Sequence, residues 1–179
     1  MKVTETNVPG VVILEPEVYA DHRGFLLESF NVRDFQKILP EFRSLQDNDS
    51  FSPLAGTLRG IHYQKAPMEQ IKIVRAVTGA VFDVAVDLRR DSPTFGKWTG
   101  TVLSAENHRQ LVIPRGFGHA YCTLTPDVHL LYKYDNYFSA EHYREVYWND
   151  PAVGIDWPVR APVLSDKDKN APLLAQADL

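Results

Sequence analysis

Four side chains in this 179-residue chain are of types that move or hold protons: His62, Lys72, Tyr132 and Asp168. A histidine has an unperturbed pKa of about 6.5, so it can take a proton at neutral pH, and a tyrosine held in a dry pocket can return one. A buried lysine can offset charge that develops on an oxygen atom, and a carboxylate can orient a histidine. Together these residue types indicate proton-transfer chemistry.

Each of the four also has an interpretation without chemistry. A histidine in a strand is more often a satisfied polar residue than a base, and a core tyrosine needs only one partner for its hydroxyl. A strand lysine is usually solvated. Asp168 stands with Asp166 and Lys167 in a charge cluster that is typical of an exposed loop. Residue type alone leaves both interpretations open.

Strand alternation predicts which of these side chains share a face. Tyr132 alternates with apolar residues and therefore belongs to the inward face of its strand. Arg59 and His62 are three residues apart, so an unbroken strand would point them in opposite directions. A bulge at Gly60 would bring both side chains into one cavity.

The histidines do not have the spacing of a metal centre. Small β-barrels often build such a centre from a His-x-His pair and a glutamate on a neighbouring strand. No two histidines of this chain have that spacing; they are His22, His62, His108, His119, His129 and His142. We therefore expect metal-independent chemistry and no cofactor.

The distribution of glycine and proline along the chain is typical of an all-β protein. Ten Gly and 12 Pro separate short runs rich in Val, Ile, Leu, Phe and Tyr, and Thr78-Gly79 between two runs is typical of a tight hairpin. One short helix is predicted over 32–39, before Pro40, and the Pro-rich end predicts an irregular C-terminal strap. Short strands at this spacing favour a sandwich, jelly roll or barrel in one domain, residues 1–179. The predicted strands cover 11–14, 25–30, 57–63, 70–77, 80–88, 100–103, 110–113, 119–124 and 128–135.

Composition narrows the class of protein. A hydrophobic content of 44% supports a folded core, and the single cysteine, Cys122, excludes an intramolecular disulfide. The formal net charge of −4 argues against nucleic acid as the partner, although a local basic pocket can still hold an anion. No apolar run approaches the roughly 20 residues that cross a membrane, and the first residues lack the apolar core of a secretory signal. We therefore expect a cytoplasmic protein.

Ten short segments, spread from about residue 9 to about residue 173, match one protein family in order and spacing. They are Asp21-His22-Arg23-Gly24-Phe25 with Glu28 and Phe30, Gln46-Asp47-Asn48, Leu58-Arg59-Gly60-Ile61-His62-Tyr63-Gln64, Asp83-Val84-Ala85-Val86-Asp87-Leu88-Arg89, Ser92-Pro93-Thr94-Phe95-Gly96, Leu103-Ser104-Ala105-Glu106-Asn107, Ile113-Pro114-x-Gly116-Phe117, Tyr132-Lys133, Trp148-Asn149-Asp150-Pro151 and Leu164-Ser165-x-Lys167-Asp168. One such motif is a weak signal, but ten in register are highly specific. The chain resembles the dTDP-4-dehydrorhamnose 3,5-epimerases.

The resemblance implies a cupin-like jelly-roll barrel, or double-stranded β-helix, that forms a homodimer. It also implies epimerisation at carbons 3 and 5 of a dTDP-4-keto-6-deoxyhexose, without a metal, in deoxysugar or rhamnose biosynthesis. By this resemblance His62 is the base, Asp168 its partner, Tyr132 the proton donor and Lys72 the residue that stabilises the enolate. The positions implied for nucleotide-sugar binding are Arg23, Phe25, Glu28, Gln46, Asn48, Arg59, His119, Phe138, Tyr143 and Lys167. Arg23 and Arg59 would contact the diphosphate and, with Lys72 and Lys167, form the basic pocket.

Two positions depart from the family pattern. Phe138 stands where the family has a tyrosine that stacks on the nucleotide base, and its ring keeps that ability. Tyr143 stands where the family often has a glutamate that contacts the nucleotide, which bears on base or ribose selectivity. Neither change touches the base, its carboxylate or the acid.

Three alternatives remain open at the level of sequence. The closest is an epimerase that acts on only carbon 3 or carbon 5 of a related sugar in secondary metabolism. A sugar 3,4-ketoisomerase of related fold is disfavoured, because the full epimerase motif set is present. A non-catalytic barrel that binds sugar nucleotides would not need His62, Tyr132 and Asp168 together.

Overall fold

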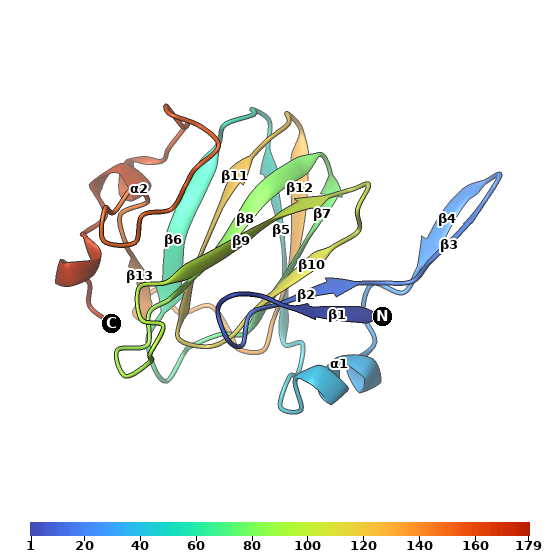
Figure 1. The fold of residues 1–179 in the computed structure, drawn as a ribbon, viewed down its shortest axis with the longest axis horizontal. Helices are drawn as coiled ribbons and strands as arrows, with labels where there is room; N and C mark the ends of the chain where they lie inside the picture. The colour runs from blue at the N-terminus through green and yellow to red at the C-terminus, as the bar shows by residue number, and fades with distance from the viewer.

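In the computed structural model, which describes residues 1–179, most strands belong to two antiparallel sheets that face each other (Figure 1). The strands are β1 (Lys2–Glu5), β2 (Val12–Glu15), β3 (Val18–Asp21), β4 (Gly24–Leu27), β5 (Gln46–Ser52), β6 (Leu58–Gln64), β7 (Lys72–Thr78), β8 (Ala80–Asp87), β9 (Trp98–Ser104), β10 (Gln110–Ile113), β11 (Phe117–Thr123), β12 (Val128–Tyr134) and β13 (Tyr143–Glu145). The larger sheet has the order β1-β2-β10-β7-β12-β5, and the second has the order β13-β6-β11-β8-β9. Strand neighbours that are distant in sequence make this the expected cupin-like jelly roll.

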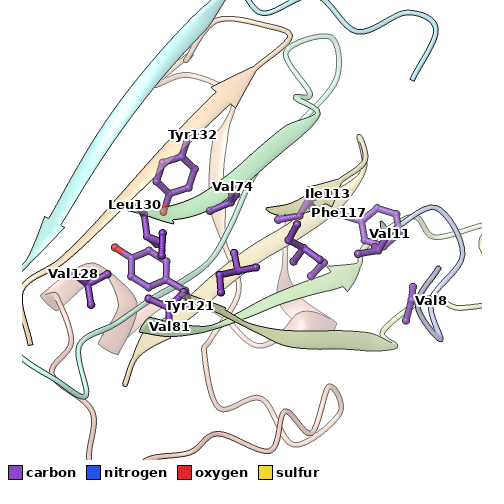
Figure 2. Close-up of a cluster of buried hydrophobic side chains, with 14 residues drawn as sticks. Val8, Val11, Val74, Val81, Ile113, Phe117, Tyr121, Val128, Leu130 and Tyr132 are labelled. Carbon is purple, nitrogen blue, oxygen red and sulfur yellow. The ribbon is translucent and has the colours of Figure 1, made fainter. Parts of the chain in front are cut away.

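The main core lies between the two sheets. Every second side chain along a strand points into this space, and these positions are mostly apolar. Here 14 buried residues form one cluster (Figure 2). Leu111 and Leu130 from the larger sheet and Val81 from the second are fully buried. Each such side chain contributes roughly 1.5–3 kcal/mol through its burial. Two tyrosines, Tyr121 and Tyr132, also belong to the cluster, so the apolar core includes two hydroxyl groups.

The C-terminal strap is more regular than the sequence indicated. It contains the short helix α2 (Asp166–Asn170) and the single-turn 3-10 helix η1 (Leu174–Gln176). Ser165 caps α2, since its Oγ accepts a hydrogen bond from the Asp168 backbone N–H at 3.1 Å. Leu174 and Ala177 pack into a second apolar cluster on the outer side of the second sheet. This packing holds the strap, and with it Asp168, beside β6.

The predicted helix over 32–39 is confirmed as α1 (Val32–Ile38). The Asn31 side chain caps it by accepting a hydrogen bond from the Arg33 backbone N–H, and Phe35 is its buried residue.

The chain contains no helix of the length and hydrophobicity that crossing a bilayer requires.

The predicted strand over 25–30 is confirmed only as far as Leu27, as β4 of a hairpin, and residues 28–30 lie outside any strand. Strands β3 and β4 pair with each other and with no other strand. The hairpin projects away from the barrel (Figure 1). Tyr19, Phe25 and Leu26 expose 60%, 60% and 73% of their surface, so this arm carries large apolar side chains that its own chain does not cover.

Candidate active site

A cavity of about 550 Å³ lies between the two sheets and is lined from both. The larger sheet contributes residues of β5, β7 and β12, and the second sheet contributes residues of β6 and β11. Nine of the residues singled out from the sequence line this cavity: Gln46, Asn48, Arg59, His62, Lys72, His119, Tyr132, Phe138 and Tyr143. The arrangement of strands therefore brings together residues that lie as far apart in sequence as Gln46 and Tyr143.

His62 and Asp168 form a hydrogen-bonded pair, with 2.6 Å between His62 Nε2 and Asp168 Oδ1. Asp168 is almost fully buried and also accepts hydrogen bonds from the Gly60 backbone N–H and the Ser165 hydroxyl. Burial opposes ionisation of this carboxyl, but the bonds from His62 and Ser165 outweigh it and hold the pKa of Asp168 below its usual value. An ionised carboxylate thus faces a histidine that opens onto the cavity.

The predicted kink at Gly60 is confirmed. The pairing of β6 with β11 shifts register between Arg59 and His62, and Gly60 has a φ of +127°. A Cβ at Gly60 would lie 2.3 Å from the Cβ of Ala120, a distance that no side chain tolerates. Glycine is therefore required here, and the kink points both Arg59 and His62 at the cavity.

Lys72 and Tyr132 reach the cavity from two adjacent strands of the larger sheet. Lys72 is buried, and its Nζ donates a hydrogen bond to the His62 carbonyl oxygen at 3.2 Å. Burial lowers the pKa of Lys72 to about 8, because removal from water penalises the charged form. Burial likewise raises the pKa of Tyr132 well above its usual value, so the phenol keeps its proton. The cavity therefore contains a cation and a neutral proton donor.

His119 lies directly opposite His62 in the pairing of β11 with β6. Its Nε2 is 3.0 Å from both carboxyl oxygens of Asp83. Burial nevertheless lowers the pKa of His119, so this ring is neutral near pH 7. Asp83 was not singled out from the sequence. The available signal was its position as a charged residue within an otherwise apolar strand, which requires a buried partner.

Aromatic rings stand at the mouth of the cavity. Phe138 is 56% exposed, and its ring centroid is 5.8 Å from that of Tyr143. Gln46 Oε1 accepts a hydrogen bond from the Phe138 backbone N–H at 2.9 Å, and buried Gln64 accepts one from the Ser139 backbone N–H. These two glutamines hold the loop so that the Phe138 ring stays at the opening. The role of Gln64 was not foreseen from the sequence.

Four of the residues predicted for substrate binding do not line the cavity of their own chain. Arg23, Phe25 and Glu28 belong to or adjoin the projecting hairpin, where Arg23 pairs with Asp21 at 2.6 Å. Lys167 lies behind the cavity wall, with its Nζ 5.9 Å from the ring centroid of Tyr143. Of the four predicted cations, a single chain therefore brings only Arg59 and Lys72 to the cavity.

One group of metal-ligating side chain types lies at this site. His62, Asp168 and Glu145 each offer one atom, and the three atoms lie within 4.8 Å of one another. The His62 and Asp168 atoms bond to each other, and Asp168 has two further donors. Metal coordination would have to replace these bonds, so the geometry is that of a base with its partner carboxylate.

Comparison with known proteins gives one family throughout. The model of the dTDP-4-dehydrorhamnose 3,5-epimerase family matches residues 5–176. The chain is 49% identical over 179 residues to the dTDP-4-dehydrorhamnose 3,5-epimerase of Shigella flexneri. The aligned region covers 99% of this chain and 98% of that protein. It is 38% identical to the dTDP-4-dehydrorhamnose 3-epimerase of Streptomyces niveus, over 99% of this chain and 86% of that protein.

Two solved structures are similar over nearly the full chain. The dTDP-4-dehydrorhamnose 3,5-epimerase of Bacillus anthracis, with TDP and PPi bound, has a TM-score of 0.93 at 49% identity and covers 96% of this chain and 98% of its own. The dTDP-6-deoxy-D-glucose-3,5-epimerase of Legionella pneumophila, in complex with dTDP-4-keto-L-rhamnose, has a TM-score of 0.93 at 42% identity. The match covers 98% of this chain and 93% of that chain.

Proposed function

The chain belongs to the dTDP-4-dehydrorhamnose 3,5-epimerase family, and on that premise we propose that it is an isomerase that inverts carbons 3 and 5 of a dTDP-4-keto-6-deoxyhexose. The observation that carries the proposal is the hydrogen-bonded pair of His62 and Asp168, which faces one cavity together with Lys72 and Tyr132. A barrel that only binds its ligand has no need of a base, an acid and a buried cation at one place.

The chemistry follows from the position of the ketone. The protons on carbons 3 and 5 both lie next to the 4-keto carbon, so loss of either one gives an enolate. His62 takes the proton and becomes an imidazolium, which the ionised Asp168 stabilises. The carbon–hydrogen electron pair moves into the enolate, and the Lys72 cation offsets the charge on its oxygen. Tyr132 then donates a proton to the opposite face, which inverts the centre and leaves a phenolate. The phenolate regains a proton from solvent and His62 releases its proton to solvent, so both groups are restored for the next inversion.

The mouth of the cavity fits the nucleotide part of such a substrate. The rings of Phe138 and Tyr143 offer stacking surfaces for a planar base. Arg59 brings a guanidinium that can contact a diphosphate, and Gln46 and Asn48 bring amides from β5. The bound ligands of the two solved relatives, TDP and a dTDP-sugar, support this assignment.

The proposal includes a homodimer in which the hairpin of β3 and β4 reaches the cavity of the partner protomer. The hairpin projects from its own barrel (Figure 1) and exposes Phe25 and Leu26. Apolar side chains on a projecting arm favour burial against another surface. Such a contact would bring Arg23 and Glu28 to the cavity, in agreement with the substrate-binding role that the resemblance gives them. A nucleotide-sugar substrate also supports the expected cytoplasmic location.

Solvent deuterium exchange tests the reaction. The protein is incubated in D₂O with dTDP-4-keto-6-deoxyglucose, and the sugar is analysed by NMR. We expect deuterium at carbons 3 and 5 together with inversion at both. No deuterium at either carbon would refute the epimerase assignment, and a 3-keto product would indicate a ketoisomerase.

The second candidate function is epimerisation at carbon 3 alone. The similarity to the Streptomyces niveus dTDP-4-dehydrorhamnose 3-epimerase is the observation that favours it. Deuterium and inversion at carbon 3, with carbon 5 unchanged, would establish this alternative. The higher identity to the Shigella flexneri 3,5-epimerase favours action at both carbons.

A further inference from the structure

A second carboxyl group, that of Glu145, lies beside the pair of His62 and Asp168. Glu145 is the last residue of β13, and it lies directly opposite His62 in the pairing of β13 with β6. Residues paired across antiparallel strands send their side chains to the same side of the sheet. One oxygen of Glu145, one ring nitrogen of His62 and one oxygen of Asp168 lie within 4.8 Å of one another.

The Glu145 carboxyl interacts with the Tyr143 hydroxyl, but one of its oxygens has no hydrogen-bond partner. Its Oε1 is buried and accepts no hydrogen bond. Asp168, in contrast, has three hydrogen-bond donors around its carboxyl. An unpartnered buried oxygen costs free energy, so the contact with Tyr143 leaves one oxygen of this carboxyl unsatisfied.

Glu145 does not line the cavity proposed for the substrate. It lines a second cavity of about 550 Å³ on the far side of Tyr143, together with Arg144 and Lys167. Any effect of Glu145 on the reaction must therefore pass through another residue. The group within reach that the reaction uses is the His62–Asp168 pair.

The charged and titratable groups around His62 show what Glu145 would supply. Asp168 comes from α2, His119 from β11 and Lys72 from β7, and the Tyr143 ring centroid is 5.4 Å from that of His62. His119 is neutral near pH 7, and its partner Asp83 lies beyond it. Burial, together with the Glu145 carboxyl, raises the pKa of Tyr143 and keeps its hydroxyl protonated. When His62 becomes an imidazolium, Asp168 is hydrogen-bonded to it, while the Asp83 carboxylate and the enolate oxygen offset the charge of Lys72.

We propose, on the basis of the function proposed above, that Glu145 is a positioning residue whose carboxylate joins Asp168 in stabilising the imidazolium form of His62. Opposite charges a few ångströms apart favour the charged form of the base, and the effect is larger where water is partly excluded. The second carboxylate would stabilise the charge on the ring without touching the sugar.

The test compares Glu145→Gln, which keeps the shape and removes the charge, with the matched control Glu141→Gln in the preceding exposed turn. All buffers contain a chelator, so that an ion at the three-ligand group cannot contribute. In Glu145→Gln we expect kcat to fall about 3- to 10-fold with KM unchanged, and the acid limb of the pH profile to move about one unit lower, since one unit corresponds to a tenfold change. Glu141→Gln should behave as the wild type.

A second measurement does not depend on turnover. The ring protons of His62 are identified by NMR through their loss in His62→Asn, and their titration midpoint is followed in the unliganded protein. A midpoint about one pH unit lower in Glu145→Gln than in the wild type supports the proposal. An unchanged midpoint overturns it, even if kcat falls. If the Gln variant does not fold, Glu145→Ala is titrated in its place with the same two outcomes. A shifted midpoint in a protein that does not turn over the sugar would refute the proposed function and leave this inference standing.

Discussion

His62 and Asp168 are 106 residues apart in sequence, yet His62 Nε2 lies 2.6 Å from Asp168 Oδ1. The histidine comes from β6 in the wall of the barrel, and the carboxylate comes from α2 in the C-terminal strap. Packing of Leu174 and Ala177 onto the outside of the second sheet holds the strap in place. The base of the proposed reaction is therefore completed by a segment that contributes no strand to either main sheet.

Replacement of His62 by asparagine removes the proposed base and keeps a polar side chain of similar width. We expect kcat to fall at least about a thousandfold, because the proton on carbon then has no acceptor. The affinity for dTDP should change less than about threefold, since dTDP has no proton to abstract. Turnover by rapid mixing and dTDP affinity by calorimetry check the two halves. Activity that persists in His62→Asn would show that another residue is the base.

Tyr132→Phe keeps the ring and removes the proton that is donated to the opposite face. We expect inversion to slow by about 100-fold or more, within the usual range for loss of a general acid. His62 can still take a proton and return it to the same face, so solvent deuterium should enter with retained configuration. NMR of the sugar in D₂O separates exchange from inversion. Equal loss of both would mean that Tyr132 does not act after the enolate has formed.

The buried Lys72 predicts a limit to activity at alkaline pH. Its pKa is lowered to about 8, so the cation that offsets the enolate charge is present below that pH and is lost as the pH rises through it. We expect kcat/KM to decline with a midpoint near pH 8. In Lys72→Arg, which stays charged, the decline should move to higher pH. A pH–rate profile with the same alkaline midpoint in both proteins would assign that limb to a different group.

Arg59→Ala tests the proposed contact with the diphosphate. The Arg59 guanidinium donates a hydrogen bond to the Phe51 carbonyl oxygen at the cavity wall. Loss of a charge-assisted contact should raise KM about 10- to 100-fold with a smaller change in kcat. Steady-state kinetics with the dTDP-sugar measure the split. A fall in kcat alone would place Arg59 in the chemical step.

Subunit mixing tests the exchange of hairpins between protomers. An Arg23→Ala protomer has the base but a defective arm, and a His62→Asn protomer has an intact arm but no base. If each arm serves the partner's cavity, a heterodimer contains one complete site. Random pairing then gives about a quarter of wild-type activity, because half of the dimers are mixed and each has one good site of two. Activity no higher than that of Arg23→Ala alone would mean that each arm serves its own chain.

The sequence by itself determined the features that depend on local periodicity. Alternation along a strand has a period of two residues, so it correctly predicted that Tyr132 faces inward and that a kink at Gly60 would turn Arg59 and His62 to one cavity. The all-β class and α1 followed in the same way from short apolar runs and their breaks. The resemblance of ten segments added the family, which the comparisons confirm.

Two strands that build the site escaped detection because their residues are polar. The residues of β5 read Gln-Asp-Asn-Asp-Ser-Phe-Ser, which lacks the apolar alternation of a half-buried strand. β5 lines a polar cavity, so polar residues stand where a half-buried strand would otherwise have apolar ones. Strand β13 has only three residues and shows no period at all.

Only the tertiary structure decided which distant groups meet. The bonds from His62 to Asp168 and from His119 to Asp83, and the position of Glu145 opposite His62, depend on strand register and on the packing of the strap. The same holds for the hairpin, which carries Arg23 and Phe25 away from the cavity of its own chain. Local sequence sets the direction of a side chain within its strand. Its partner is set by backbone pairing and core packing across more than 100 residues, and these exist only in the folded chain.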